Sequence, residues 1–196
     1  MKRVFIIHGW GGWSEEGWFP WLKKELEKRS VEVHVPAMPD TDKPKIETWV
    51  PHLKKLVHKA DADTYFVGHS IGCQTILRYL ERLNPLTKIG GIILVAPWIH
   101  LDQETLREEG EEALAIAKPW TETPINFKKV QQLTEKTVCI FSDNDSYVPL
   151  TESEFFKQQM NAKTIIEPDK GHFSGSDKIT KIPAVLKELL TMMQHV

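Results

Sequence analysis

Gly68-His69-Ser70-Ile71-Gly72 matches the G-x-S-x-G pattern of a tight strand-to-helix turn that holds a serine above the edge of a sheet. The run Thr64–Val67 before it is β-branched and aromatic, which predicts a buried strand. Apolar residues after it recur at three- and four-residue spacing as far as Leu83, which predicts a helix that Pro85 stops. The pattern therefore lies between a strand and a helix. An ordinary turn with an idle serine is the alternative that this stretch alone leaves open.

The two glycines of this turn have a steric role in the prediction. A strand that turns abruptly into a helix brings backbones together, so a Cβ atom on Gly68 or Gly72 would collide with them. The turn also places Ser70 near the positive end of the helix, which favours negative charge developing beside it. These features are typical of a nucleophile elbow.

Size and composition predict one domain spanning residues 1–196. The chain has 196 residues and a mass of 22.6 kDa, with 41% hydrophobic and 27% charged residues, which suits a globular domain with a sizeable core. The net charge of -2 gives no basic footprint for nucleic acid and no polybasic membrane signal. The longest apolar runs have the length of strands, so we expect no span of a bilayer.

The cysteines and the N-terminus predict a cytoplasmic protein without metal or cofactor. Cys73 and Cys139 both fall in predicted core elements and are expected to be buried free thiols in a reducing compartment. The apolar run Val4–Ile7 follows Met1-Lys2-Arg3 and is too short for a signal peptide. The sequence contains neither C-x-x-C nor H-E-x-x-H, so no spacing in it suggests a metal site.

Short apolar runs alternate with helical patterns along the whole chain, which predicts a mostly parallel six-stranded sheet with helices on both faces. The expected strands are 4–7, 31–35, 64–67, 89–96, 137–141 and 163–167. Residues 98–136 break this rhythm. We expect them to form a helical excursion over one end of the sheet, with residues 98–120 acting as a lid or pocket wall. Thr151 and Glu154 are expected to form a capping box for the following helix.

Acidic and histidine residues follow the later predicted strands. Asp143 and Asp145 lie in the loop after strand 137–141, and proximity alone does not choose between them. His172 follows the last strand beside Gly171, whereas His195 falls in a terminal segment. Because active sites of parallel sheets lie at the carboxyl ends of strands, these loops should meet Ser70 at one edge. A serine nucleophile needs such a base and an orienting acid.

An oxyanion requires two further hydrogen-bond donors. The N–H of Ile71 is one candidate, and the N–H of Trp10 in the glycine-rich turn after the first strand is the other, with Gly11 as its alternate. Seven tryptophans are many for this length. We expect Trp10, Trp13 and Trp98 either to line an acyl or leaving-group pocket or to pack between helix and sheet. Packing is the expectation for Trp21 and Trp49.

Several stretches together carry a resemblance to one family. They are His8-Gly9-Trp10-Gly11-Gly12, Trp18-Phe19-Pro20-Trp21-Leu22, Met38-Pro39, Gly68-His69-Ser70-Ile71-Gly72, Gly91-Ile92-Ile93-Leu94-Val95, Asp145-Ser146-Tyr147-Val148-Pro149 and Gly171-His172-Phe173. As a set they resemble the small serine hydrolases of the retinoblastoma-binding-protein-nine and YdeN family, over essentially the whole chain. The resemblance implies a compact α/β-hydrolase fold with Ser70 as nucleophile and His172 as base. It implies Asp145 as acid, because the family's acid opens a D-x-x-V-P pattern.

The expected function is a serine hydrolase that cleaves small carboxylic esters, or related thioester or amide bonds, through an acyl-enzyme. The expected partner is a small ester-like molecule, and no protein partner is identified. The alternative is a protein-binding module that keeps a hydrolase scaffold with little use of its triad. The family name hints at such a role, but no short partner motif in the sequence supports it.

Overall fold

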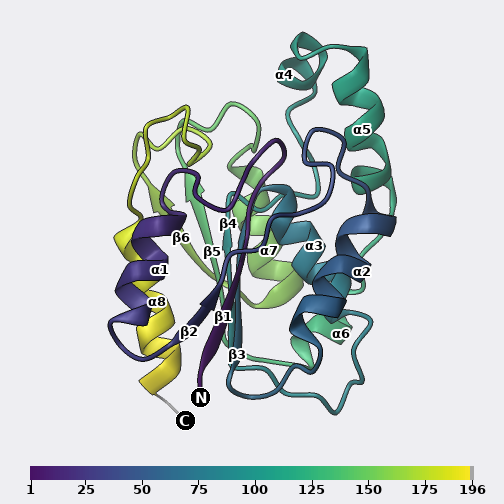
Figure 1. Ribbon diagram of the computed structural model, residues 1–196. Helices are drawn as coiled ribbons and strands as arrows, with labels where there is room; N and C mark the ends of the chain where they lie inside the picture. Colours follow the sequence, from purple (N-terminus) through teal and green to yellow (C-terminus); the bar gives the residue numbers. More distant parts are fainter. Residues whose placement is uncertain (195–196) are drawn as a thin grey trace.

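Six parallel strands form one sheet in the computed structural model, which describes residues 1–194 (Figure 1). The strands are β1 (Arg3–Ile7), β2 (Glu32–His34), β3 (Thr64–His69), β4 (Gly91–Val95), β5 (Thr137–Ser142) and β6 (Lys163–Glu167). Their order across the sheet is β2-β1-β3-β4-β5-β6, and each neighbouring pair is parallel. The predicted fold class is therefore confirmed. β3, the strand that leads into Ser70, lies inside the sheet between β1 and β4.

Helices cover both faces of the sheet. α1 (Phe19–Glu27) and α8 (Pro183–Gln194) pack on one side, and α2 (Ile46–Val57) and α3 (Ile71–Leu80) lie on the other (Figure 1). On the α3 side, α6 (Phe127–Gln131) contacts α3, and α7 (Thr151–Met160) contacts α6. Right-handed crossovers explain this division, because the chain leaves β1 towards β2 and then reverses towards β3. The reversal makes the ends of β1 and β3 the topological switch point of the sheet.

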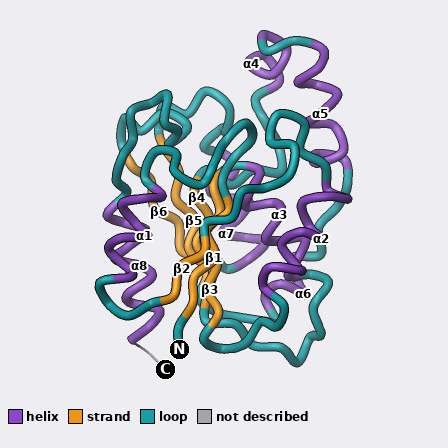
Figure 2. Tube along the Cα trace, in the orientation of Figure 1, coloured by secondary structure: helices purple, strands orange, loops and turns teal. Residues whose placement is uncertain are grey.

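The long segment between β4 and β5 is helical, as expected. It contains α4 (Gln103–Glu108) and α5 (Glu111–Glu122) before α6, and the first two rise above the upper end of the sheet (Figure 1). The loops that follow the strands gather at the same end (Figure 2). The candidate catalytic residues and the excursion therefore meet at the carboxyl edge of the sheet.

The core consists of the strands and the helix stripes that face them. Every residue of β3, β4 and β5 is buried, because helices cover both sides of these inner strands. Trp49 is fully buried and Trp21 is half-buried against the core, so both pack as expected. Cys73 and Cys139 are buried free thiols.

The predicted capping box at Thr151 is wrong. Leu150 is the N-cap of α7, and its backbone is already helical with φ −59° and ψ −18°. Thr151 therefore lies inside the first turn, where its side chain cannot cap the helix. Glu154 instead hydrogen bonds to Gln158 within the helix. His195 lies outside the described residues.

Candidate active site

The backbone at Ser70 has the sharp turn that the sequence predicts. Ser70 lies between β3 and α3 with φ 52° and ψ −122°, a region that non-glycine residues rarely adopt. A Cβ added to Gly68 would lie 2.8 Å from the backbone of Cys73, and one added to Gly72 would lie 2.6 Å from the carbonyl oxygen of His8. The two glycines therefore permit the close contact of β1, β3 and α3 that lifts Ser70 above the sheet.

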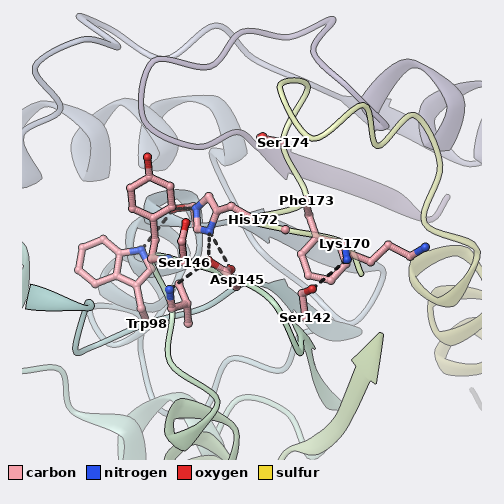
Figure 3. Close-up of polar contacts among 12 residues, drawn as sticks. Trp98, Ser142, Asp145, Ser146, Lys170, His172, Phe173 and Ser174 are labelled. Atoms are coloured by element: carbon pink, nitrogen blue, oxygen red, sulfur yellow. Dashed lines mark hydrogen bonds and ion pairs between the residues drawn. The ribbon is translucent and has the colours of Figure 1, made fainter. Parts of the chain in front are cut away.

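A chain of hydrogen bonds joins Ser70, His172 and Asp145. The Ser70 Oγ lies 2.8 Å from Nε2 of His172. Nδ1 of His172 lies 2.9 Å from Oδ2 and 3.1 Å from Oδ1 of Asp145, the two contacts drawn between these residues in Figure 3. Because a carboxylate only accepts, Nδ1–H is the donor and Nε2 is free to accept the serine proton. The Asp145 side chain is 2% exposed and that of His172 is 17% exposed, so substrate can reach the base but not the acid.

The two candidate acids have different contacts. Oδ1 of Asp145 also accepts hydrogen bonds from the backbone N–H groups of Tyr147 and Val148, at 2.9 and 3.1 Å, which fix the carboxylate beside the imidazole. Asp143 instead accepts the N–H of Asp169 at 2.9 Å. The geometry brings Asp145, not Asp143, to His172.

Side chains at the end of β5 and in the loop after it hold the loop that carries His172. Ser142 Oγ accepts the N–H of Lys170 at 3.0 Å, as Figure 3 shows, and Asn144 Oδ1 accepts the N–H of Gly171 at 2.8 Å. Together with the Asp143 contact, these bonds tie the acid loop and the base loop into one unit.

His69 connects that unit to the serine turn. Its Nε2 lies 2.7 Å from the carbonyl oxygen of His172, so Nε2–H donates and Nδ1 carries no proton. Among the residues that the structure describes, Nδ1 is buried and has no hydrogen-bond partner. Burial, reinforced by the neighbouring His172, lowers the pKa of His69 to about 3. His69 is therefore a neutral buried donor at physiological pH. In the sequence His69 is only the variable position before Ser70 in the G-x-S-x-G pattern.

The glycine-rich turn after β1 supplies the second oxyanion candidate. His8 holds this turn: its Nδ1–H donates to the Gly9 carbonyl at 2.8 Å, and its Nε2 accepts the N–H of Met38 at 3.1 Å. Burial lowers the pKa of His8, which keeps this tautomer neutral. The N–H of Gly11 already donates to the Thr41 carbonyl at 2.8 Å, which removes it as an alternate donor. The backbone N–H of Trp10 has no such bond within residues 1–194.

A cavity of about 520 Å³ opens onto Ser70 and His172. Its lining includes Trp10, Ile71 and Trp98, which places three of the predicted site residues at the cavity. Trp13 does not line it, and its side chain is 57% exposed. The pocket prediction for Trp13 is therefore wrong, and at this exposure the side chain is not packed between helix and sheet either.

Comparison with known proteins identifies the family. A family profile described as serine hydrolase matches residues 4–191. The YdeN protein of Bacillus subtilis is 33% identical over 184 residues, which cover 94% of this chain and 92% of YdeN. The chain belongs to the serine hydrolase family. Serine hydrolase RBBP9 of Rattus norvegicus is 25% identical over 193 residues, covering 96% of each chain.

Solved structures show the same fold for this serine hydrolase. The crystal structure of the Bacillus subtilis ydeN gene product superposes with a TM-score of 0.88 at 32% identity, covering 99% of this chain and 100% of that one. Est1E from Butyrivibrio proteoclasticus with ferulic acid bound has a TM-score of 0.72 at 18% identity, covering 99% of this chain and 90% of that one. The second likeness concerns the fold alone.

The excursion contributes cavity residues of this serine hydrolase that the sequence analysis did not single out. Leu101, Leu106 and Ala113 form an apolar part of the lining, and Glu109 and Tyr147 lie nearby. The Tyr147 hydroxyl donates to Glu109 at 2.6 Å, and this bond raises the pKa of Tyr147 to about 12. Leu101, Leu106, Glu109 and Ala113 lie in the segment 98–120 that was expected to form a lid or pocket wall, but no local pattern marks them individually.

Residues 1–194 contain neither a metal-binding cluster nor a membrane-spanning helix. That part of the chain holds no group of three or more His, Cys, Asp or Glu side chains arranged to bind a metal ion. None of its helices is long and apolar enough to cross a membrane.

Proposed function

We propose that this serine hydrolase cleaves small carboxylic esters, or related thioester or amide bonds, through an acyl-enzyme on Ser70. His172 is the general base and acid, and Asp145 orients its imidazole. The observation that carries the proposal is the continuous contact Ser70 Oγ–His172 Nε2 and His172 Nδ1–Asp145 at the base of an open cavity. A reducing, cytoplasmic setting is part of the proposal, because both cysteines are free thiols.

The proposed reaction follows from the hydrogen bonds. As Ser70 Oγ attacks the acyl carbon, its proton moves to Nε2 of His172, and Asp145 stabilises the imidazolium. The carbonyl oxygen becomes an oxyanion that accepts the N–H groups of Trp10 and Ile71. Collapse of this intermediate breaks the bond to the leaving group, which takes the proton from His172. Water then repeats the sequence and releases the acid.

The cavity supports a substrate of modest size. Its volume of about 520 Å³ lies in the range of small-molecule sites. The apolar residues Leu101, Leu106 and Ala113 on one wall suit an acyl chain. In this proposal α4 and α5 act as the wall or lid of the acyl pocket.

The test is labelling with a fluorophosphonate probe, followed by mass mapping of the labelled peptide and assays with short-chain p-nitrophenyl esters. Wild type should be labelled at Ser70 and should hydrolyse the esters. Ser70→Ala should lose both properties and keep its circular dichroism spectrum. Ser153→Ala is the matched control, because within residues 1–194 its hydroxyl donates only to the carbonyl of Leu150, just before α7. Equal hydrolysis by wild type and Ser70→Ala would overturn the proposal of an acyl-enzyme on Ser70.

A further inference from the structure

The side chain of Trp98 touches the proposed nucleophile. Its indole Nε1–H points at Ser70 Oγ with a separation of 3.3 Å, and the residue is only 2% exposed. Ser70 Oγ therefore has two partners: it donates its proton to His172 and accepts from Trp98. One lone pair of the oxygen remains for attack on a substrate. A pocket wall needs only the apolar ring of Trp98, so the position of its N–H calls for a separate explanation.

A buried polar chain from α3 holds the backbone of Trp98. The Trp98 carbonyl accepts Nε2–H of Gln74 at 3.1 Å. Gln74 Oε1 accepts two hydrogen bonds from Arg78, at 2.8 and 3.2 Å. Arg78 also donates to the carbonyls of Trp120 and Thr123. Because α3 starts at the serine turn, this chain fixes Trp98 relative to the helix that carries Ser70.

Glu152 of α7 holds the next two residues. Its carboxylate is buried, and Oε2 accepts the N–H groups of Ile99 and His100 at 2.5 and 3.3 Å. Oε1 lies 2.8 Å from Nδ1 of His100. A buried carboxylate is costly unless such donors satisfy it. The loop that carries Trp98 is thus held by polar side chains from two different helices, both almost fully buried.

We propose that Trp98 is a catalytic hydrogen-bond donor to Ser70 Oγ, kept in place by Gln74 and Glu152. The inference rests on the proposed function, since it assigns Trp98 a role in the acyl-enzyme reaction. During acylation the O–H bond of Ser70 breaks before the new C–O bond is complete, and the indole N–H stabilises the charge on Oγ. During deacylation the C–Oγ bond breaks, and Oγ takes the electron pair and then the proton of His172. The same N–H stabilises this departing oxygen.

The decisive variant is Trp98→Phe, which keeps an aromatic ring in the wall and removes the N–H. One net hydrogen bond corresponds to a fall of roughly fivefold in rate. We expect this fall in the rate of fluorophosphonate labelling and in both burst and steady-state rates with p-nitrophenyl acetate. The same fall should occur with p-nitrophenyl butyrate, because Oγ is common to both reactions. A loss of wall contact would instead change KM and grow with acyl length.

Two further variants complete the experiment. Trp49→Phe is the matched control: it removes a buried indole N–H, which donates to the Pro39 carbonyl at 2.7 Å, and Trp49 does not line the cavity. Its rates should equal those of wild type. Gln74→Met removes the support of the Trp98 carbonyl and should lower the labelling rate in the same direction as Trp98→Phe. If thermal unfolding shows that Trp98→Phe does not fold, Gln74→Met still tests the proposal.

The outcomes separate this inference from the proposed function. If wild type is labelled at Ser70 but Trp98→Phe reacts at the wild-type rate or faster, the donor role is overturned and the acyl-enzyme proposal stands. A change confined to KM or to the longer ester would also overturn the donor role and would show that Trp98 acts only as part of the pocket wall. If wild type is not labelled at Ser70, both proposals fail.

Discussion

Acidification should destabilise this fold through His69. The pKa of His69 is lowered from 6.5 to about 3 in the folded protein, chiefly by burial. Below pH 6.5 the unfolded chain gains a proton at this residue that the folded chain does not bind, so the folded state becomes less stable as the pH is lowered. The contribution is fully present above pH 6.5 and is lost progressively down to about pH 3. Each pH unit below 6.5 lowers the free energy of unfolding by about 1.4 kcal/mol, so at about pH 5 this group lowers it by about 2 kcal/mol.

The assay is urea unfolding, followed by circular dichroism at about pH 8 and about pH 5, for wild type and His69→Gln. The glutamine amide can still donate to the His172 carbonyl but does not titrate. The difference in unfolding free energy between the two pH values should shrink by about 2 kcal/mol in the variant. The matched control His52→Gln, which removes a half-buried imidazole from α2, should leave the difference unchanged. An unchanged pH dependence in His69→Gln would refute the assignment of His69 as a neutral buried donor.

Two other substitutions test the site and the turn. Asp145→Asn should lower kcat by a factor on the order of 10⁴, because an amide favours the wrong tautomer of His172. Asp143→Asn should lower kcat far less, since its amide oxygen can still accept the N–H of Asp169. Steady-state ester hydrolysis compares the two variants, and a larger loss of kcat at Asp143 would reverse the assignment of the acid. Gly72→Ala should lower the unfolding free energy by roughly 1–3 kcal/mol, because its Cβ would meet the His8 carbonyl. Urea unfolding measures this cost, and wild-type stability would show that the turn has room for a side chain.

The sheet and the serine turn could be predicted because their signals are local. The runs Val4–Ile7 and Thr64–Val67 are mostly apolar, and each leads into a glycine-containing turn, so strand and turn follow from neighbouring residues. Steric demands at Gly68 and Gly72 also belong to the turn itself. These features depend little on distant parts of the chain, which is why the predicted positions agree with the structure.

The exceptions depend on contacts between distant residues or on the exact entry of the chain into a helix. Nothing near Trp13 in sequence indicates that its side chain is exposed and does not line the cavity. The Thr151 prediction used the right spacing, but the helix begins one residue earlier and shifts the cap to Leu150. Glu152 gives no local sign of its role, because the backbone groups that it holds lie more than fifty residues away.

The arrangement of strands explains why the acid and base loops need so many mutual hydrogen bonds. Neighbouring strands are about 4.8 Å apart, so the ends of β5 and β6 lie roughly 10 and 14 Å from the end of β3. Both loops must therefore reach back across β4 before His172 can approach Ser70. Asp143, Ser142 and Asn144 first tie the two loops together, and His69 then holds the joined unit at the His172 carbonyl. Trp98 lies in the segment that follows β4, the strand that these loops cross, and its indole N–H reaches Ser70 Oγ from there.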